Sequence, residues 1–268
     1  EPGPMLALRS NEFPYPLHDE AQAARDLGET LLSRGQVAAL IVAGGQGTRL
    51  GANIPKGMLP IQPVSSRTLF DGFCAQLRVI GKRYGRTPPL FVMTSEATHD
   101  ETLAYFKECS WFGLKPGRVF LFKQGMVPVL GLDGRLIMAG KDRIAFSPDG
   151  HGGCLPALER TGMISRMTSL GIEWVHYFQV DNVATVVCDP AFIGLTAARG
   201  ADASLKAVRK TDPSEKVGVF VKKNGKPAVV EYSEMTSAQN SMRDASGGLA
   251  LCAANTAIHV FRAEFLQT

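Results

Sequence analysis

The chain has 268 residues, and 45% of them are hydrophobic, so it can bury a core and is not intrinsically disordered. Its formal charge of +4 comes from 29 basic and 25 acidic residues that are scattered along the sequence, which argues against nucleic-acid binding. The five cysteines contain no CxxC pair, so neither a disulfide scaffold nor a zinc site is expected. No segment approaches the roughly 20 apolar residues of a membrane span.

Taken together, these features predict a cytoplasmic chain with free thiols and no membrane or protein partner. The first 35 residues predict a lead-in with one helix over residues 18–34, where alanines and leucines recur at helical spacing and Gly35 follows. Four prolines before residue 17 prevent an earlier helix.

Strands and helices are then predicted to alternate along the chain. The predicted strands cover residues 37–43, 90–94, 119–123, 174–180 and 203–208. The predicted helices cover residues 68–84, 98–109, 157–167 and 190–199. Thr98 and Glu101 predict a capping box at the start of the second of these helices. A β-hairpin is predicted from residues 217–221 and 227–232 through Asn224-Gly225. This order predicts an α/β fold with a doubly wound, mostly parallel sheet and an antiparallel hairpin at one edge.

A glycine-rich loop follows the first predicted strand of this sheet. It contains Gly44, Gly45 and Gly47, then Arg49, and Lys56 comes after Pro55. Glycines at the carboxyl end of a strand let backbone N–H groups approach an anion, and Arg49 offers a planar fork to phosphate oxygens. The sequence matches neither the P-loop nor the dinucleotide fingerprint. The loop therefore predicts a phosphate site of another kind, and the alternative is a tight turn with two surface cations.

The segment AGGQGTRLG (Ala43–Gly51), followed by Pro55-Lys56-Gly57-Met58, resembles the signature of the UDP-sugar pyrophosphorylases, in particular the UDP-N-acetylglucosamine pyrophosphorylase type. The resemblance extends over residues 37–266. Further matching stretches are RTLF (67–70), MTS (93–95), WFGL (111–114), QGM (124–126), SPDGHGG (147–153), VDN (180–182), VGV (217–219), VEYSE (230–234) and Asn255. The resemblance implies a Rossmann-like nucleotidyltransferase fold, with residues 36–268 as a catalytic domain that is incomplete at its C-terminal end.

The reaction that the resemblance implies is attack of a sugar 1-phosphate on the α-phosphorus of UTP, with release of pyrophosphate. Arg49 matches the cation for the leaving phosphates, and Lys56 matches the cation near the α-phosphate. Asp181, after the strand over residues 174–180, matches the carboxylate that holds Mg²⁺. An aspartate that only caps the next turn is the alternative for Asp181.

The nucleotide contacts that the resemblance implies are Ala43, the three loop glycines, Gly150 and Gln124, which matches a uracil-reading glutamine. The implied sugar contacts are His151, Gly218, Glu231 and Asn255. A plain surface glutamine, a structural histidine and an ordinary hairpin carboxylate are the alternatives at Gln124, His151 and Glu231.

Around the expected sugar site the sequence departs from the family. The N-acetylglucosamine enzymes usually carry Asn at the position of His151, whereas UDP-glucose pyrophosphorylases carry His. Ala254 also stands where the family usually has Gly. The expected sugar is therefore N-acetylglucosamine 1-phosphate, with glucose 1-phosphate as the alternative. An inactive fragment that only binds uridine nucleotides is the competing hypothesis.

Overall fold

The computed structural model describes residues 5–7, 18–47, 51, 54–62 and 64–267. The α-helices are α1 (His18–Arg34), α2 (Leu69–Tyr84), α3 (His99–Glu108), α4 (Cys154–Arg160), α5 (Met163–Ser169), α6 (Pro190–Ala198) and α7 (Ser237–Ser241). The strands are β1 (Met5–Ala7), β2 (Val37–Val42), β3 (Leu90–Thr94), β4 (Val119–Lys123), β5 (Met126–Pro128), β6 (Phe146–Pro148), β7 (Trp174–Gln179), β8 (Ala203–Arg209), β9 (Val219–Lys223), β10 (Lys226–Val230) and β11 (Ala253–Arg262). No helix in this described part is long and apolar enough to cross a membrane.

The chain divides into two compact units. The larger unit is Ala23–Ala203 with Val260–Thr268, and the smaller unit is Glu1–Gln22 with Ser204–His259. These two units are defined by contacts between residues. The division expected after residue 35 therefore stays a prediction.

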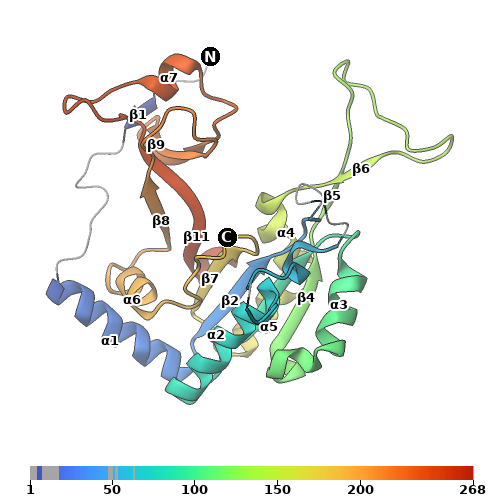
Figure 1. Ribbon diagram of the computed structural model, residues 1–268, viewed down its shortest axis with the longest axis vertical. Coiled ribbons are helices and arrows are strands. Elements are labelled where there is room, and N and C mark those ends of the chain that lie inside the picture. Colours follow the sequence, from blue (N-terminus) through green and yellow to red (C-terminus); the bar gives the residue numbers. More distant parts are fainter. Residues whose placement is uncertain (1–4, 8–17, 48–50, 52–53, 63, 268) are drawn as a thin grey trace. The chain divides into compact units, whose positions relative to one another are not determined.

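The larger unit is built on four parallel strands in the order β7, β2, β3, β4. Every residue of β3 and nearly every residue of β2 is buried, as expected of central strands covered on both faces. Helices α4 and α5 pack on one face, where Leu158 joins a cluster with Leu40 and Phe91. Helix α2 packs on the other face, where the rings of Phe73 and Phe178 meet edge to face at 5.0 Å. The doubly wound, mostly parallel sheet is therefore confirmed, and Figure 1 shows helices on both sides of these strands.

The smaller unit contains the antiparallel part of the fold. Strand β9 pairs with β1 and with β10, and the β9–β10 hairpin turns through Asn224 and Gly225 with φ of 53° and 76°. Two successive positive φ angles are those of a type I′ hairpin turn, which confirms the prediction. Pro227 lies on β10, which pairs only with β9 in the described sheet, so its missing N–H removes no central hydrogen bond.

Two local predictions are wrong. The helix expected over residues 157–167 is two helices, α4 and α5, because the chain turns at Gly162 with a φ of 72°. The capping box at Thr98 does not form, since its hydroxyl accepts a hydrogen bond from the Ser95 N–H at 3.0 Å. The Thr98 side chain therefore closes the turn before α3 and leaves the helix uncapped.

Candidate functional site

The carboxyl ends of the four parallel strands lie side by side because their registers match. Val42 of β2 pairs with Met93 of β3 and with Gln179 of β7. Beyond the strand ends, the N–H of Ala43 donates to the carbonyl of Met93 at 2.7 Å, and the N–H of Gln124 donates to that of Thr94 at 2.8 Å. The glycine loop, Gln124 and Asp181 therefore follow strands that end at one edge of the sheet, where open α/β sheets bind ligands.

The glycine loop folds back on itself through backbone hydrogen bonds. The N–H of Gly47 donates to Ile54 at 2.9 Å, and the N–H of Lys56 donates to the carbonyl of Gly45 at 3.1 Å. A Cβ on Gly44 would lie 2.7 Å from Oε1 of Gln124, so the glutamine side chain occupies the space that this glycine leaves. Glycine at this position thus brings the predicted uracil-reading residue against the loop. Arg49 lies outside the described residues.

Lys56 and Asp181 form an ion pair at the sheet edge. Nζ of Lys56 lies 2.6 Å from Oδ2 of Asp181, with the two side chains 27% and 44% exposed. Lys56 begins a short 3₁₀ turn in which Gly57 is pressed against the ring of Phe70, at 2.1 Å from where its Cβ would lie. The matching motif includes Gly57 beside Lys56, but the contact of Gly57 with Phe70 depends on tertiary packing and is not predicted by the sequence. A cation and a carboxylate are thus placed beside the loop.

The segment that carries Gly150 is held by a buried carboxylate. Added Cβ atoms on Gly125 and Gly153 would both lie within about 2.2 Å of the Asp149 carboxylate, so Asp149 fills the space between these glycines. The N–H of Asp149 donates to the carbonyl of Gly125 at 3.1 Å. Gly150 has φ 76° and ψ −170°, a conformation open only to glycine, and the exposed His151 follows it. The turn after Gln124 and the loop of Gly150 therefore form one packed structure.

The Asp149 carboxylate also carries an unmet hydrogen-bonding capacity. Its Oδ1 is buried and has no hydrogen-bond partner among the described residues. Asp149 belongs to the SPDGHGG motif that contains His151, but the motif alone predicts no role for it. The glycines that follow Asp149 in the motif indicate room for its carboxylate. The sequence does not show, however, that Asp149 packs against Gly125 and Gly153.

Polar groups also join the ends of β3 and β4. Oγ1 of Thr94 lies 2.7 Å from Nδ1 of His99 and donates to the carbonyl of Phe122 at 3.0 Å. Burial lowers the pKa of His99, and the charge of Lys123 lowers it further, so both effects favour the neutral imidazole. His99 therefore supports the strand ends from which Gln124 emerges, a role that its dispersed position in the sequence did not indicate.

Three of the four predicted sugar residues (Gly218, Glu231 and Asn255) come together in the smaller unit, whereas His151 belongs to the larger unit. A Cβ on Gly218 would lie 2.9 Å from Oε1 of Glu231, and the N–H of Asn255 donates to the carbonyl of Gly218 at 2.8 Å. The amide oxygen of Asn255 accepts from the N–H of Ala257 at 2.8 Å, whereas the side chain of Glu231 is exposed. Glu231 is thus open to a ligand, and the amide nitrogen of Asn255 is the group left for one.

The described residues offer one carboxylate to a metal beside the glycine loop. No group of three or more His, Cys, Asp or Glu among them is arranged to hold a metal ion by protein ligands alone. Mg²⁺ is commonly held by one or two carboxylates together with substrate phosphates. The half-exposed Asp181, beside a loop suited to phosphates, fits that mode and does not fit a cage made only of protein ligands.

Comparison with known proteins agrees with this geometry. The family model described as UTP–glucose-1-phosphate uridylyltransferase matches residues 12–260. The human UDP-N-acetylhexosamine pyrophosphorylase-like protein 1 is 38% identical over 99% of this chain and 55% of its own length. The UDP-N-acetylglucosamine pyrophosphorylase of Saccharomyces cerevisiae is 36% identical over 90% of this chain and 51% of its own.

A solved structure extends the likeness to the fold. The UDP-N-acetylglucosamine pyrophosphorylase of Trypanosoma brucei, in complex with an inhibitor, superposes with a TM-score of 0.85 at 33% identity, covering 93% of this chain and 51% of its own. The chain thus spans about half the length of the relatives that it matches. The match of the family model over most of the chain, together with these relatives, shows that it belongs to the UTP–glucose-1-phosphate uridylyltransferase family.

Proposed function

We propose that this chain is the nucleotide-binding part of a uridylyltransferase that makes a UDP-sugar and pyrophosphate from UTP and a sugar 1-phosphate. The observation that carries the proposal is the meeting of the glycine loop, Gln124 and the Lys56–Asp181 pair at one edge of the parallel sheet. Membership of the family supports it. The five free cysteines support a cytoplasmic, reducing location for this activity.

The proposed chemistry is transfer of the uridylyl group. A phosphate oxygen of the sugar 1-phosphate forms a bond to the α-phosphorus of UTP, and the bond from that phosphorus to the bridging oxygen of pyrophosphate breaks. Such transfers depend on positioning and charge neutralisation more than on covalent work by the protein. Lys56 is assigned to the negative charge near the α-phosphate and Arg49 to that of the leaving phosphates.

Asp181 is the residue proposed to hold Mg²⁺, which would supply neutralisation of phosphate charge. In the structure its carboxylate accepts a hydrogen bond from Lys56, so the charges of the two side chains neutralise each other. Phosphate oxygens offer Lys56 an alternative anionic partner, and this exchange would leave the carboxylate available to a cation.

Base recognition is assigned to Gln124 and to the loop of Gly150. A glutamine amide both donates and accepts, so it can pair with the N–H and carbonyl edge of uracil. The contact of its side chain with the position of Gly44 limits where the amide can lie. Gly150, which carries no side chain, leaves the backbone accessible to the face of the base.

The proposed sugar substrate is N-acetylglucosamine 1-phosphate, because the named relatives above are N-acetylhexosamine and N-acetylglucosamine pyrophosphorylases. His151, Gly218, Glu231 and Asn255 are the residues proposed to contact the sugar. Glucose 1-phosphate is the second candidate, favoured by His151 at the position where the N-acetylglucosamine enzymes usually carry asparagine.

The test is a coupled assay of pyrophosphate release by the full-length protein, with UTP, Mg²⁺ and one sugar 1-phosphate at a time. N-acetylglucosamine, N-acetylgalactosamine and glucose 1-phosphates are compared side by side, and turnover is expected to be fastest with the first. The variant His151→Asn should widen this preference over glucose 1-phosphate. UTP binding without release of pyrophosphate from any of the three would overturn the enzymatic proposal in favour of a binding fragment.

A further inference from the structure

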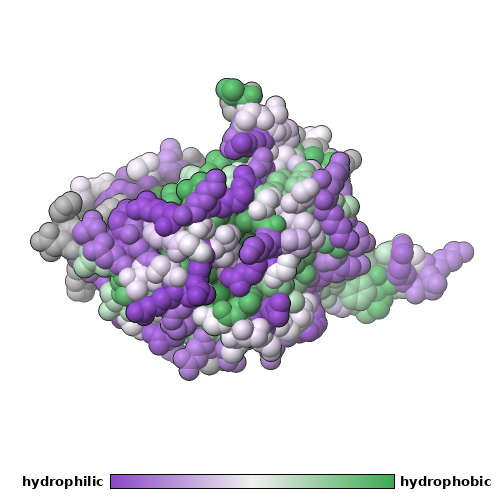
Figure 2. Space-filling model, turned by 90° about the horizontal axis from the view of Figure 1, so that it is seen from below, coloured by the Kyte–Doolittle hydropathy of each residue, from purple (hydrophilic) through white to green (hydrophobic). Residues whose placement is uncertain are grey.

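A cavity lies at the opposite edge of the parallel sheet from the glycine loop, where β3 and β4 begin. It has a volume of about 590 Å³ and is lined by the last turns of α2, by residues 85–88 and by residues 113–118. These segments all belong to the larger unit. Its size falls within the range of small-molecule sites, roughly 300–1,000 Å³. Figure 2 views the molecule from below, and hydrophilic side chains surround small apolar areas on the face that it shows.

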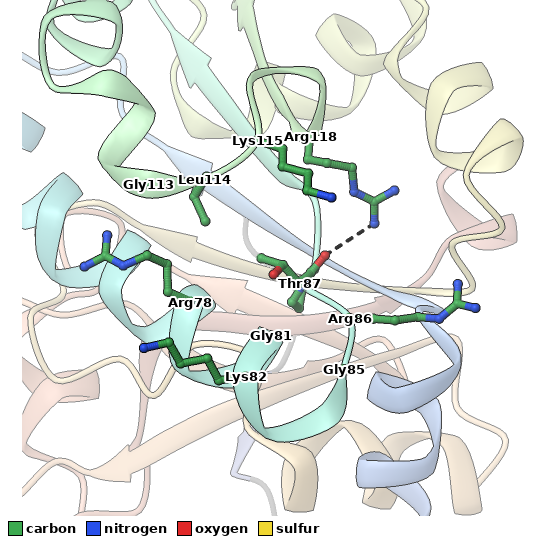
Figure 3. Close-up of a pocket in the computed structure, with 11 residues that line it drawn as sticks. Arg78, Gly81, Lys82, Gly85, Arg86, Thr87, Gly113, Leu114, Lys115 and Arg118 are labelled. Carbon is green, nitrogen blue, oxygen red and sulfur yellow. Dashed lines mark hydrogen bonds between the residues drawn. The ribbon is translucent and has the colours of Figure 1, made fainter.

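The side chains around this cavity are strongly basic. Five cationic residues and no Asp or Glu line it: Arg78, Lys82, Arg86, Lys115 and Arg118. In Figure 3, Lys115 and Arg118 lie on one side, Arg78 and Lys82 lie on the other, and Thr87 lies between them. Arg118 is held there by a hydrogen bond to the carbonyl of Thr87 at 3.3 Å. Cations from two separate chain segments thus surround one space.

Most of this positive charge is not balanced by the protein. Arg78 lies 3.9 Å from Asp71 and donates to the carbonyl of Phe112. Among the described residues, no carboxylate lies within ion-pair distance of Lys82, Lys115 or Arg118. Burial lowers the pKa of Arg118, and the nearby charges of Arg86 and Arg166 lower it further. Binding of an anion would relieve this repulsion between like charges.

The dipole of α2 explains only some of the cations around this cavity. Lys82 lies in the last turn of α2, where a positive charge favours the helix dipole. Lys115 and Arg118 lie outside α2, in and beside the 3₁₀ turn Pro116–Arg118, so the dipole of α2 does not account for them. Their approach to the same space is a property of the tertiary structure.

The wall that carries Lys115 is held in a strained conformation. Ser110, Trp111 and Phe112 have φ of 48°, 56° and 51°, and Gly113 follows with 73°. The left-handed conformation is unfavourable for each of the three non-glycine residues. Edge-to-face packing of Phe112 on Phe106 at 5.1 Å stabilises the turn. Strain of this kind is often found where a binding group must be held in place.

We propose that this cavity binds a small polyanion with two or more phosphate groups, at a site distinct from the glycine loop. The three arginines offer planar forks that suit phosphate oxygens, and the two lysines add point charges. The volume of the cavity suits a small molecule. The glycine loop follows the carboxyl end of β2, and this cavity lies at the amino ends of β3 and β4, so both sites can be occupied together.

The test uses inorganic tripolyphosphate as the probe, with calorimetry and hydrogen–deuterium exchange on the full-length protein at low and physiological salt. Tripolyphosphate is expected to slow exchange in residues 81–88 and 113–118, and high salt is expected to weaken binding. The double variant Lys82→Ala/Lys115→Ala should lose the protection of these segments, with binding there weakened at least about tenfold. Both side chains are exposed, so the variant should fold.

The matched control is Lys141→Ala/Lys226→Ala, which removes the same charge from two exposed lysines outside the cavity and should leave binding within about twofold. Equal weakening by both double variants would reduce the effect to net charge and overturn the proposal. Protection confined to residues 44–57 would likewise overturn it, since the probe would then occupy only the glycine loop. A polyglutamate peptide that binds as tightly as tripolyphosphate would refute the phosphate chemistry.

Discussion

The Lys56–Asp181 pair carries most of the proposed chemistry while adding little to the stability of the fold. Its side chains are 27% and 44% exposed, and ion pairs on such surfaces stabilise a protein by about 0–1 kcal/mol. The replacement Lys56→Ala should therefore leave the unfolding free energy almost unchanged. Turnover should fall by about 100-fold or more, with a much smaller loss of UTP affinity, because Lys56 is assigned to charge in the transition state.

Steady-state kinetics and UTP calorimetry measure the two effects separately. Arg83→Ala is the matched control, since Arg83 pairs with Glu29 at 3.0 Å in a similar surface ion pair and has no proposed contact with phosphate. Equal losses of turnover and of UTP affinity in Lys56→Ala would contradict its assignment to the transition state.

The two adjacent glycines after His151 differ in the room around them. An added Cβ at Gly153 would lie 2.0 Å from Cγ of Asp149, whereas nothing lies within 4 Å of one at Gly152. Gly153→Ala should therefore displace Asp149 and the Gly150 loop, costing about 1–3 kcal/mol of stability and weakening UTP binding. Gly152→Ala should change both by little. Urea denaturation and UTP titration of the two variants provide the comparison, and similar behaviour would refute the packing role of Asp149.

How far the sequence predicts such residues depends on what positions them. Lys56, Gln124 and Asp181 each come after a strand of the parallel sheet, and the rule that ligands bind at the carboxyl ends of parallel strands brings them to one edge. Gly57 and Asp149 matter through contacts with Phe70 and Gly125, which are distant in the chain. Sequence spacing carries no information about such contacts.

At the scale of elements, α1 and α6 approach so closely that glycine is needed on both. A Cβ at Gly28 would lie 1.9 Å from the carbonyl oxygen of Pro190, and one at Gly194 would lie 1.7 Å from that of Ala24. Backbone atoms cannot move aside as side chains do. Gly28→Ala and Gly194→Ala should thus each destabilise the protein by about 2 kcal/mol or more, despite the higher helix propensity of alanine.

Gly72→Ala in α2 is the control for this prediction. The nearest atom to its added Cβ is Nε2 of Gln62 at 3.7 Å, an ordinary contact, so alanine should stabilise the helix by about 0.5–1 kcal/mol. Chemical denaturation of the three variants measures the change in the free energy of unfolding. If the packing of α1 on α6 controls the outcome, this free energy should fall in the Gly28 and Gly194 variants and rise in the Gly72 variant. A gain in stability at Gly28 or Gly194 would contradict the close approach.

The elements themselves were predictable where periodicity and end signals agree. Helix α1 and strands β3 and β4 have the predicted bounds, because apolar runs there end at clear stops. The break at Gly162 was missed since the apolar spacing continues through it, and one glycine alone is compatible with a helix. The antiparallel pair β5–β6 was also missed, because its residues are exposed and the two strands are three residues each. Long-range pairing of that kind leaves little local pattern.

At the scale of the whole molecule, three buried thiols link stability to pH. Burial raises the pKa of Cys154 to about 12, and burial also raises the pKa values of Cys74 and Cys188 above the usual range. In the unfolded chain these thiols ionise near pH 8.5. Above that pH the unfolded state binds fewer protons than the native state, so the free energy of unfolding falls as pH rises.

The free energy of unfolding is expected to be constant below about pH 8. Between about pH 9 and the raised pKa values it should fall by about 1.4 kcal/mol per pH unit for each thiol. Urea denaturation between pH 7 and 10.5 measures it. The variant Cys154→Ala should reduce the slope by about one third of the three-thiol contribution, although the smaller side chain lowers stability at every pH. A slope that Cys154→Ala leaves unchanged would assign the alkaline loss to other groups, such as Tyr177, whose pKa burial also raises. Cys154 is the first residue of α4 and Cys74 lies in α2, and these two helices pack on opposite faces of the sheet. Ionisation of the thiols at alkaline pH would therefore weaken the packing on both faces.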